Sequence, residues 1–309
     1  MKKIALLLDP VSTLKPAKDT SLLLAYAAQQ KGWHVYAGEP RHLCIQNEVV
    51  QGLFSPLSLT NDRHPTTGEE AWWSLRDFDC VLMRKDPPFD MRYIYATYLL
   101  ELAQKQGAQV VNDPQAIRNH NEKLAILEFP QCIPNTLVAA DIEQLRAFCT
   151  TVGDVICKPL DGMGGQSIFR IRAGDPNVTV ILQTLTENGR TPIMVQNYLP
   201  AVKNGDKRII LVDGEPLAYC LARIPAQGET RANLAAGGHG VVQPLSERDR
   251  WIAQQVGPVL ATRGLRFVGL DVIGEHLTEI NVTSPTCLVE ISQKAGDGIV
   301  ADILERLVS

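Results

Sequence analysis

Apolar and polar residues alternate over residues 1–112 in a way that predicts strands and helices in turn. The apolar run at 4–9 is typical of a strand that is buried on both faces. A helix is predicted from Thr20 to Lys31, because Gly32 follows where a C-terminal cap belongs. Further strands are predicted at 33–37, 80–84 and 109–112, and a further helix at 93–106. This alternation predicts an open, mainly parallel α/β sheet.

A second pattern begins at Pro114, which is expected to open a helix that runs to about Leu127. A compact αβ stretch follows, with a helix that Asp141 can cap. Its strands are predicted at 133–139, 155–158, 167–171 and 194–198.

From residue 207 onward the pattern becomes α+β. Asp213-Gly214 is a strong two-residue hairpin signal between strands at 208–212 and 215–222. Residues 225–240 show little periodicity and contain four glycines. Ser246 and Asp249 form a capping box for a helix to about Thr262, and a second hairpin is predicted over 267–273 and 277–282. The predicted units are therefore an α/β domain (1–120), a small αβ lid (121–200) and an α+β unit (201–309).

Composition narrows the class of protein. Of 309 residues, 45% are hydrophobic and 21% charged, which suffices for ordinary globular cores. The net charge of −4 gives no basic excess for nucleic-acid binding. The first apolar run is too short to span a membrane and lacks a signal cleavage site. Seven dispersed cysteines without CxxC suit a reducing cytoplasm, and the histidines lack zinc-ligand spacing. We therefore expect a cytoplasmic protein whose partners are neither nucleic acids nor membranes.

Lys158 ends an apolar strand and precedes a turn that contains Gly162, Gly164 and Gly165. Glycines let backbone N–H groups approach phosphate oxygens closely, and a lysine adds a positive charge for the same phosphates. The turn is not a P-loop, because no Gly-Lys-Ser/Thr follows. From spacing alone, a plain glycine-rich hairpin is an equal alternative.

Three oxygen-bearing side chains are predicted to converge on the second hairpin. Glu279 and Asn281 lie two apart on one strand, so they share a face. If residues 274–276 form the loop, Asp271 lies directly opposite Glu279. Such ligands suit Mg²⁺. The alternative is an exposed polar face, although opposed carboxylates repel unless a cation lies between them.

Other charged residues occupy suggestive positions. The long 225–240 segment is typical of a functional lid or a mobile loop, and its Arg231 could reach an anion. Arg84 and Lys85 follow a buried strand, where ligands gather in open α/β sheets, but a rigid turn also explains them. Arg208 and Arg223 could stabilise transferring phosphoryl charge, whereas a surface arginine is the usual alternative.

In this order, the motifs resemble ATP-grasp ligases and, more closely, the prokaryotic glutathione synthetase family. The resemblance spans nearly the whole chain. The stretches that carry it are 83–90 (MRKDPPFD), 93–98 (YIYATY), 121–123 (NEK), 158–165 (KPLDGMGG), 196–200 (QNYLP), 205–208 (GDKR), 222–225 (ARIP), 233–238 (NLAAGG), 269–274 (GLDVIG) and 278–286 (TEINVTSPT).

The resemblance implies an ATP-grasp fold and a reaction in which ATP, γ-glutamylcysteine and glycine give glutathione, ADP and phosphate through an acylphosphate. It implies Mg²⁺, with Mn²⁺ as a substitute, at Asp271, Glu279 and Asn281. Lys123 and Lys158 would hold phosphates, and Asp206 would contact the ribose. The remaining nucleotide-binding residues would be Gly162, Gly164, Gly165, Gln196, Asn197, Tyr198 and Leu199.

The same resemblance makes Arg208 and Arg223 catalytic, because they would hold the transferring phosphoryl group or the substrate carboxylate. The substrate and lid residues would be Arg84, Lys85, Arg231, Asn233, Gly237, Gly238, Ser284 and Thr286. His239 stands where the family is expected to have arginine. The family also implies a homo-oligomer, a tetramer.

Two alternatives stay open at this point. One is a related ATP-grasp ligase that acts on another carboxylate and amine. The other is a non-catalytic ATP-binding module with the same fold. The substrate-side stretches 83–98 and 278–286 favour glutathione synthesis over the first, and the intact metal triad and lysines favour catalysis over the second.

Overall fold

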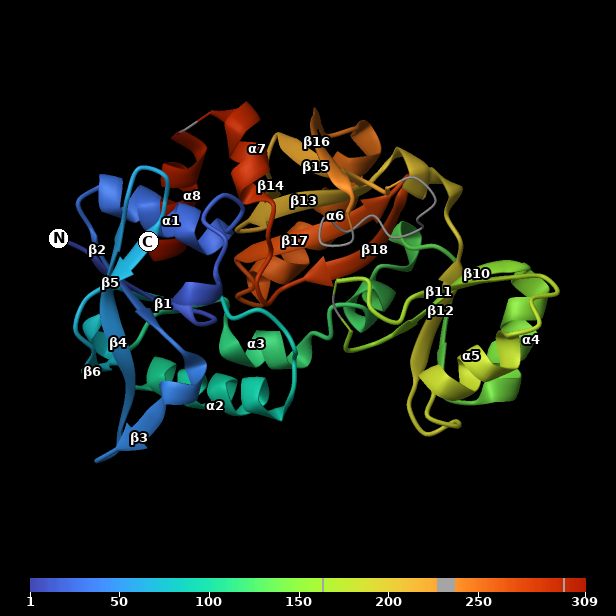
Figure 1. Ribbon diagram of the computed structural model, residues 1–309, viewed down its shortest axis with the longest axis horizontal. Helices are drawn as coiled ribbons and strands as arrows, with labels where there is room; N and C mark the ends of the chain where they lie inside the picture. The colour runs from blue at the N-terminus through green and yellow to red at the C-terminus, as the bar shows by residue number, and fades with distance from the viewer. Residues whose placement is uncertain (163, 227–236, 297) are drawn as a thin grey trace.

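A computed structural model of the protein describes residues 1–162, 164–226, 237–296 and 298–309 and arranges them around three sheets (Figure 1). The first sheet has the strand order β3-β4-β2-β1-β7-β8, with β5 and β6 on β4. The second has the order β11-β10-β12-β9. The third has the order β16-β15-β13-β17-β18, with β14 on β13, and lies between the other two in Figure 1.

The centre of the first sheet is parallel, as the alternation of strands and helices predicts. It comprises β1 (Lys3–Leu7), β2 (His34–Gly38), β7 (Cys80–Met83) and β8 (Val110–Val111). The helices α1 (Thr20–Gln30) and α2 (Met91–Lys105) connect these strands. Asp19 and Asp90 cap the two helices by accepting hydrogen bonds from backbone N–H groups. The predicted fold class is therefore confirmed.

An antiparallel extension of the first sheet was not predicted. Its strands are β3 (Cys44–Gln46), β4 (Val49–Leu59), β5 (Pro65–Thr67) and β6 (Ala71–Ser74). Strand β4 joins it to β2 through antiparallel pairs such as Tyr36 with Pro56. Short 3₁₀ turns lie at Val11–Thr13, Pro40–His42 and Leu75–Asp77.

The helix predicted from Pro114 to Leu127 is wrong in its second half. Helix α3 covers only Pro114–Asn119, and 3₁₀ turns follow at Leu124–Glu128 and Pro130–Cys132. The side-chain oxygen of Asn121 accepts hydrogen bonds from the N–H groups of Lys123 (3.1 Å) and Leu124 (3.0 Å). Such local bonds compete with the helix and turn the chain, so that Glu122 and Lys123 face the central sheet.

The second sheet forms a small unit with its own core. Its strands are β9 (Thr136–Ala139), β10 (Asp154–Pro159), β11 (Phe169–Arg172) and β12 (Ile193–Asn197), all antiparallel. Helices α4 (Ile142–Val152) and α5 (Val178–Leu185) pack on each other and contribute to one apolar cluster with the strands. Asp141 caps α4 as predicted, whereas α5 was not predicted.

The third sheet contains both predicted hairpins. Its strands are β13 (Asp206–Val212), β14 (Glu215–Pro216), β15 (Tyr219–Ile224), β16 (His239–Pro244), β17 (Phe267–Ile273) and β18 (His276–Asn281), and a 3₁₀ turn at Pro200–Asn204 precedes them. The predicted capping box of Ser246 and Asp249 starts α6 (Glu247–Thr262). The loop predicted to reach residue 240 ends earlier, because β16 begins at His239 and pairs with β15.

The last helices, α7 (Leu288–Ala295) and α8 (Gly298–Val308), return to the first sheet. Helix α8 packs on α1, and one buried apolar cluster joins residues of β1 and α1 with residues of α7 and α8. Lys2 donates from Nζ to the carbonyl of Val308 at 3.2 Å, which ties the two ends of the chain together. Across the described ranges, no helix combines the length and the apolar character that a membrane crossing requires.

Candidate active site

A cavity of about 130 Å³ lies between the second and third sheets. Its walls come from the end of β10 and the glycine-rich turn, from the end of β12, and from the β17–β18 hairpin. Every residue predicted to bind the nucleotide lines it: Lys123, Lys158, Gly162, Gly164, Gly165, Gln196, Asn197, Tyr198, Leu199 and Asp206. The fold thus brings together residues from four separate stretches of the sequence.

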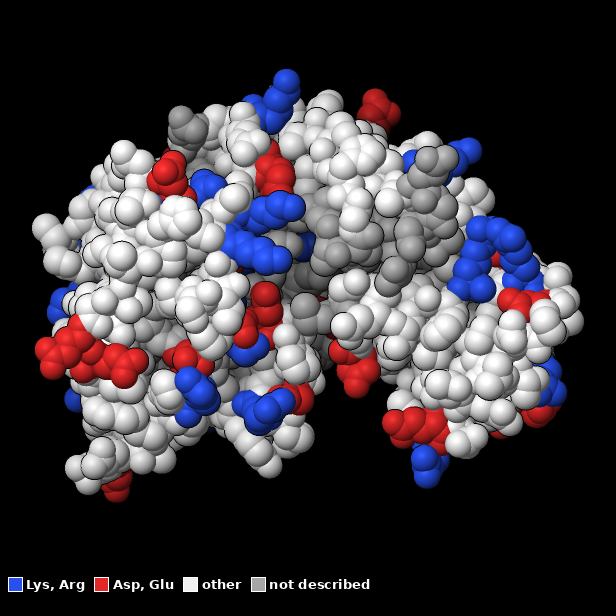
Figure 2. All heavy atoms as spheres, viewed as in Figure 1, with Lys and Arg blue, Asp and Glu red and all other residues white. Residues whose placement is uncertain are grey.

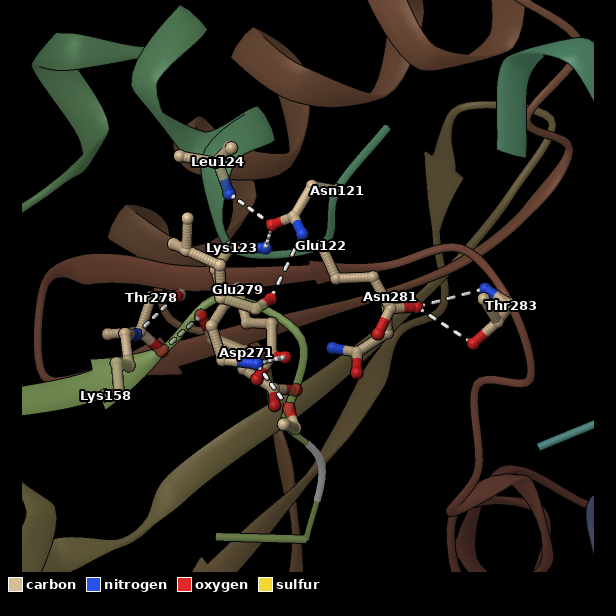
Figure 3. Close-up of polar contacts among 12 residues, drawn as sticks. Asn121, Glu122, Lys123, Leu124, Lys158, Asp271, Thr278, Glu279, Asn281 and Thr283 are labelled. Atoms are coloured by element: carbon tan, nitrogen blue, oxygen red, sulfur yellow. Dashed lines mark hydrogen bonds and ion pairs between the residues drawn. The ribbon is translucent and has the colours of Figure 1, made fainter. Parts of the chain in front are cut away.

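Two buried lysines enter this cavity from different elements (Figure 3). Lys158, on β10, donates to the carbonyl oxygen of Thr278 at 3.1 Å. Lys123 donates to the carbonyl of Gly162 at 2.5 Å and lies 3.3 Å from a carboxylate oxygen of Glu279. Burial lowers the pKa of Lys158 to about 8, although the negative charge of Glu279 opposes the shift. Both ammonium groups are therefore held next to the β17–β18 hairpin.

Asp271 and Glu279 are paired across that hairpin, as predicted, but not through the predicted loop. Ile273 pairs with His276, so the loop has two residues and not the three at 274–276. The register shifts beyond Val272, which leaves Thr278 as the extra residue of a bulge and restores the pairing of Asp271 with Glu279. The bulge also presents the carbonyl of Thr278 to Lys158.

Two buried arginines surround Asp271. Arg208 binds it with Nε to Oδ1 at 2.6 Å and with NH2 to Oδ2 at 3.2 Å. Arg223 approaches Oδ2 to 2.8 Å and also bonds Asp206 at 2.7 Å. Burial alone would raise the pKa of Asp271, but the two guanidinium groups outweigh burial and hold it well below its ordinary value. The two guanidinium groups therefore favour the charged form of Asp271.

Two polar atoms of the nucleotide cavity are buried without a partner. Within the described residues, neither Asn197 Oδ1 nor Asp206 Oδ1 has a hydrogen-bond donor in reach. Burial raises the pKa of Asp206 to about 6, even though Arg223 opposes the shift. Unpaired buried acceptors cost free energy, so each calls for a donor. Hydroxyl and amino groups of a bound ligand would supply such donors.

The oxygen atoms of Asp271, Glu279 and Asn281 form the only predicted metal site. Asn281 donates through Nδ2 to the carbonyl of Gly269 at 3.2 Å, which leaves its side-chain oxygen available as a ligand. Over the described part of the chain, no cluster of three or more His, Cys, Asp or Glu residues could hold a metal by itself. The donor set therefore fits Mg²⁺ that takes its other ligands from phosphates and water.

A second and larger cavity, of about 580 Å³, lies between the first and third sheets. It falls within the size range of small-molecule sites, roughly 300–1,000 Å³. Among the predicted site residues, Arg208, Arg223, Asn281, Ser284 and Thr286 line it. The two cavities share Gly164, Asp271 and Glu279, so they meet at the carboxylate pair. Figure 2 shows basic and acidic side chains close together on the face in front of this region.

Arg84 and Lys85 follow β7, as predicted, but line neither cavity. Arg84 is buried outside both cavities, where it donates to the hydroxyl of Ser21 at 3.1 Å and to the carbonyl of Pro285 at 2.8 Å. Lys85 pairs with Asp9 at 2.7 Å and lines neither cavity. The strand end does approach the substrate cavity, but through Asp86 and Pro87. A substrate role for Arg84 and Lys85 therefore stays a prediction from the sequence, and neither cavity supports it.

The predicted lid residues are placed only in part. Arg231 and Asn233 lie outside the described residues. Gly237 and Gly238 precede β16 and line neither cavity. His239 begins β16 opposite Ile224. A lid over 225–240 thus stays a prediction from the sequence.

Glu122 is a site residue that was not predicted from the sequence. Its Oε1 accepts hydrogen bonds from the N–H groups of Val282 (2.9 Å) and Thr283 (3.1 Å) and from the Thr283 hydroxyl (2.9 Å). These bonds join the turn that carries Lys123 to the end of the strand that carries Asn281 (Figure 3). Burial raises the pKa of Glu122, and Glu279 adds to the shift. The sequence signal that could have identified Glu122 was its acidic side chain within the motif at 121–123.

The chain that forms this site matches a known protein family and known proteins. Residues 2–118 match the family model of the prokaryotic glutathione synthetase N-terminal domain, and residues 122–296 match its ATP-grasp domain. The chain is 54% identical over 309 residues to a glutathione synthetase of Pseudomonas syringae pv. tomato, which covers 98% of this chain and 97% of that one. It is 53% identical over 313 residues to a glutathione synthetase of Pseudomonas aeruginosa, which covers 99% of each.

Solved structures show the same fold at lower identity. D-cycloserine synthetase DcsG superposes with a TM-score of 0.69 at 15% identity and covers 98% of this chain and 99% of its own. The ATP-grasp ligase PsnB superposes with a TM-score of 0.63 at 17% identity and covers 99% of both. These likenesses establish the ATP-grasp architecture and nothing about the substrate.

Proposed function

The chain belongs to the prokaryotic glutathione synthetase family of ATP-grasp ligases, and we propose that its two cavities join γ-glutamylcysteine to glycine while ATP is cleaved to ADP and phosphate. The observation that carries this proposal is the meeting of the cavities at Asp271 and Glu279. ATP bound in the first cavity would place its γ-phosphate beside a donor carboxylate bound in the second.

In the first step, an oxygen of the cysteinyl carboxylate attacks the γ-phosphorus, and the bond to ADP breaks. Lys123 and Lys158 hold the phosphates from one side, which neutralises charge and fixes the line of attack. The backbone N–H groups of the turn at Gly164 and Gly165 are free of Cβ crowding and can approach the same oxygens. No nucleophilic side chain is required.

Arg208 and Arg223 stabilise the negative charge that shifts during phosphoryl transfer. Both guanidinium groups are buried and fixed on Asp271, so they need little reorganisation when the charge shifts. In the second step, the unprotonated amine of glycine attacks the acylphosphate carbonyl, and phosphate leaves. The new amide bond keeps the carbonyl, and the amine loses one proton to solvent or phosphate.

Asp271, Glu279 and Asn281 are the residues that would hold Mg²⁺, with Mn²⁺ as a substitute. When bound, the cation neutralises phosphate charge and orients the γ-phosphate. The two carboxylates lie on one face of the hairpin, and both cavities open onto them. Asp271 also forms ion pairs with Arg208 and Arg223, so one residue links the metal site with the phosphoryl site.

The unit boundaries at residues 120 and 200 belong to the same proposal. The separate family models for 2–118 and 122–296 and the separate core of the second sheet support them. A homo-oligomeric state and a cytoplasmic location are proposed from the family alone.

The test is release of phosphate from ATP by the purified protein, measured with and without each substrate. We expect release that requires both γ-glutamylcysteine and glycine, with glutathione identified as the product. Turnover with D-alanine alone, without any response to γ-glutamylcysteine, would overturn the proposal in favour of another ATP-grasp ligase.

A further inference from the structure

The second sheet forms one wall of the nucleotide cavity, and residues that do not line the cavity lie at the outer end of this wall. Side chains along a strand point to alternate faces of a sheet. On β10, Val155 and Cys157 enter the apolar core of the second sheet, whereas Ile156 and Lys158 line the cavity. Asp154 shares the alternation of Ile156 and Lys158, so it lies on the cavity face of the sheet.

The register of the neighbouring strands brings two further side chains to this face. Arg170 on β11 pairs with Ile156 from one side, and Gln196 on β12 pairs with Ile156 from the other. Tyr198 lies two positions after Gln196, and its N–H donates to the carbonyl of Asp154 at 2.9 Å. Asp154, Arg170 and Tyr198 come from three separate stretches of the second sheet and therefore lie beside one another.

These three residues form a stack, which we call the Tyr198 clamp. Arg170 donates from Nε to Oδ1 of Asp154 at 2.8 Å and from NH2 to Oδ2 at 2.6 Å. The guanidinium carbon lies 3.4 Å from the centroid of the Tyr198 ring. The hydrogen bonds between the two partners raise the pKa of Arg170 and lower the pKa of Asp154, which favours the charged form of both. A bidentate pair fixes the plane of the guanidinium, and the ring packs on that plane.

Tyr198 lies at the end of the cavity that is remote from the proposed phosphate-binding residues. It is level with Asp154, and Lys158 lies four positions further along β10, or ~13 Å at about 3.3 Å per residue. The side chain between these two ends on the cavity face of β10 is the apolar Ile156. When the phosphates of a nucleotide contact Lys158, its base is therefore the part that lies nearest to Tyr198.

An ordinary surface ion pair does not account for this arrangement. Exposed ion pairs contribute little to stability, whereas only 20% of the Arg170 side chain is accessible. Tyr198 lines the cavity and Arg170 does not, so the guanidinium supports the ring from outside the cavity. A side chain that is held in place before the ligand arrives loses less conformational entropy on binding.

We propose that Arg170 and Asp154 are positioning residues for the nucleotide, which hold the Tyr198 ring in place as a preformed wall for the base. The inference rests on the proposed function, and it extends the residues on which ATP affinity depends to two that lie outside the cavity. Loss of the clamp weakens recognition of the base and leaves the binding of the phosphates and the chemical steps unchanged.

The test measures equilibrium binding, which requires no turnover. Titration calorimetry gives the dissociation constant of ADP with Mg²⁺, and displacement of ADP gives that of inorganic tripolyphosphate, which lacks the base. Arg170→Met removes the planar cation and keeps an apolar stem, and Arg170→Lys keeps the charge without the bidentate geometry. Arg172→Met is the matched control, because Arg172 is exposed and lies two positions further along the same strand.

We expect Arg170→Met to raise the dissociation constant of ADP at least about threefold, on the scale of a lost cation–π contact, and to leave that of tripolyphosphate unchanged. Arg170→Lys should have an intermediate effect, and Arg172→Met should have none. KM for ATP should rise with the dissociation constant of ADP, while kcat and KM for γ-glutamylcysteine stay within about twofold. In a Tyr198→Leu protein, Arg170→Met should add little, because the ring through which it acts is gone.

Unchanged binding of ADP to Arg170→Met would overturn the positioning role. An equal rise for ADP and tripolyphosphate would also overturn it, because the whole second sheet would then be disturbed. The same holds if Arg170→Met has as large an effect in the Tyr198→Leu protein as in the unmodified one. If Arg170→Met lowers the melting temperature, Asp154→Asn takes its place, because it keeps the shape of the side chain and removes the charge that anchors the guanidinium.

The failure of the clamp and the failure of the proposed function are distinguishable. If the unmodified protein makes no glutathione from γ-glutamylcysteine and glycine, the proposed function is wrong. The comparison of ADP with tripolyphosphate decides on the clamp in either case, because it measures only the nucleotide.

Discussion

The ammonium of Lys123 lies 3.3 Å from a carboxylate oxygen of Glu279, so a residue proposed to hold phosphate contacts a residue proposed to hold the metal. The sequence predicted repulsion between Asp271 and Glu279 of about 3 kcal/mol at ~5 Å. In the fold, each carboxylate has cations of the protein beside it: Lys123 for Glu279, and two arginines for Asp271. The pair is therefore tolerated through these contacts, and the two carboxylates should respond differently to substitution.

Glu279→Gln should reduce turnover by at least ~100-fold, equivalent to about 2.7 kcal/mol of barrier, because one metal ligand loses its charge. Stability should change little, since the substitution removes both the attraction to Lys123 and the repulsion from Asp271. Steady-state turnover against Mg²⁺ concentration and thermal unfolding in EDTA check both expectations. Near-normal turnover with a lower melting temperature would show a structural polar face.

Asp271→Asn should destabilise the fold by about 3 kcal/mol or more, because it leaves buried Arg208 and Arg223 without their counter-charge. Urea unfolding measures the loss, and Glu279→Gln is the matched control on the neighbouring strand. The interpretation fails if both variants unfold at the same urea concentration.

The KM for ATP should rise as pH increases through 8. Lys158 has a pKa of about 8 when folded, so its ammonium, and with it the attraction to phosphate, is lost above that pH. In the unfolded chain the lysine keeps its proton to about 10.4. Between these values the unfolded state binds more protons, so this residue makes the free energy of unfolding rise with pH. Stability and ATP affinity should thus change in opposite directions.

Lys158→Arg provides the control, because an arginine stays charged throughout this range. KM for ATP is measured from pH 7 to 9.5 in both proteins. An identical rise in the arginine variant would assign the pH dependence to another group.

Arg84→Met should lower the free energy of unfolding by about 2 kcal/mol, since the Ser21 hydroxyl and the Pro285 carbonyl lose a charged donor. KM for ATP and for γ-glutamylcysteine should stay within about twofold of the unmodified protein. Chemical unfolding and steady-state kinetics are compared on the same preparation. A raised KM with unchanged stability would instead support the substrate role that the sequence implied.

Local signals predicted the parts of the fold that local chemistry determines. The glycine after α1, the caps of α4 and α6 and the turn at Asp213-Gly214 follow from residues that satisfy nearby backbone groups or permit a positive φ. Segment 178–185 is rich in β-branched residues, yet it forms α5 because it packs on α4. Strand β4 contains Gly52 and Pro56, which locally indicate a break, but its pairing with β2 and with β3, β5 and β6 keeps it extended.

The site was predicted where motifs supply its residues and missed where topology assembles it. The turn at Lys158 and the triad on the second hairpin carry their own signals in type and spacing. Lys15, Asp86 and Glu290 come from three stretches that no local pattern connects, and the tertiary fold brings them to one cavity. In open α/β sheets, ligands bind at the carboxyl ends of the strands. This rule predicted ligand-binding residues after residue 83, but it applies equally to the segment that follows β1.

The packing of α7 and α8 on α1 has a consequence for how the chain folds during synthesis. Residues such as Leu6 and Leu24 share their apolar cluster with Ile303 and Leu304, which leave the ribosome almost three hundred positions later. The second sheet closes its core within residues 137–195 and can therefore become compact early. The apolar side chains of the first sheet and of α1 that α7 and α8 cover stay exposed until translation is nearly finished. The nascent chain is thus most exposed to aggregation in the part that is made first.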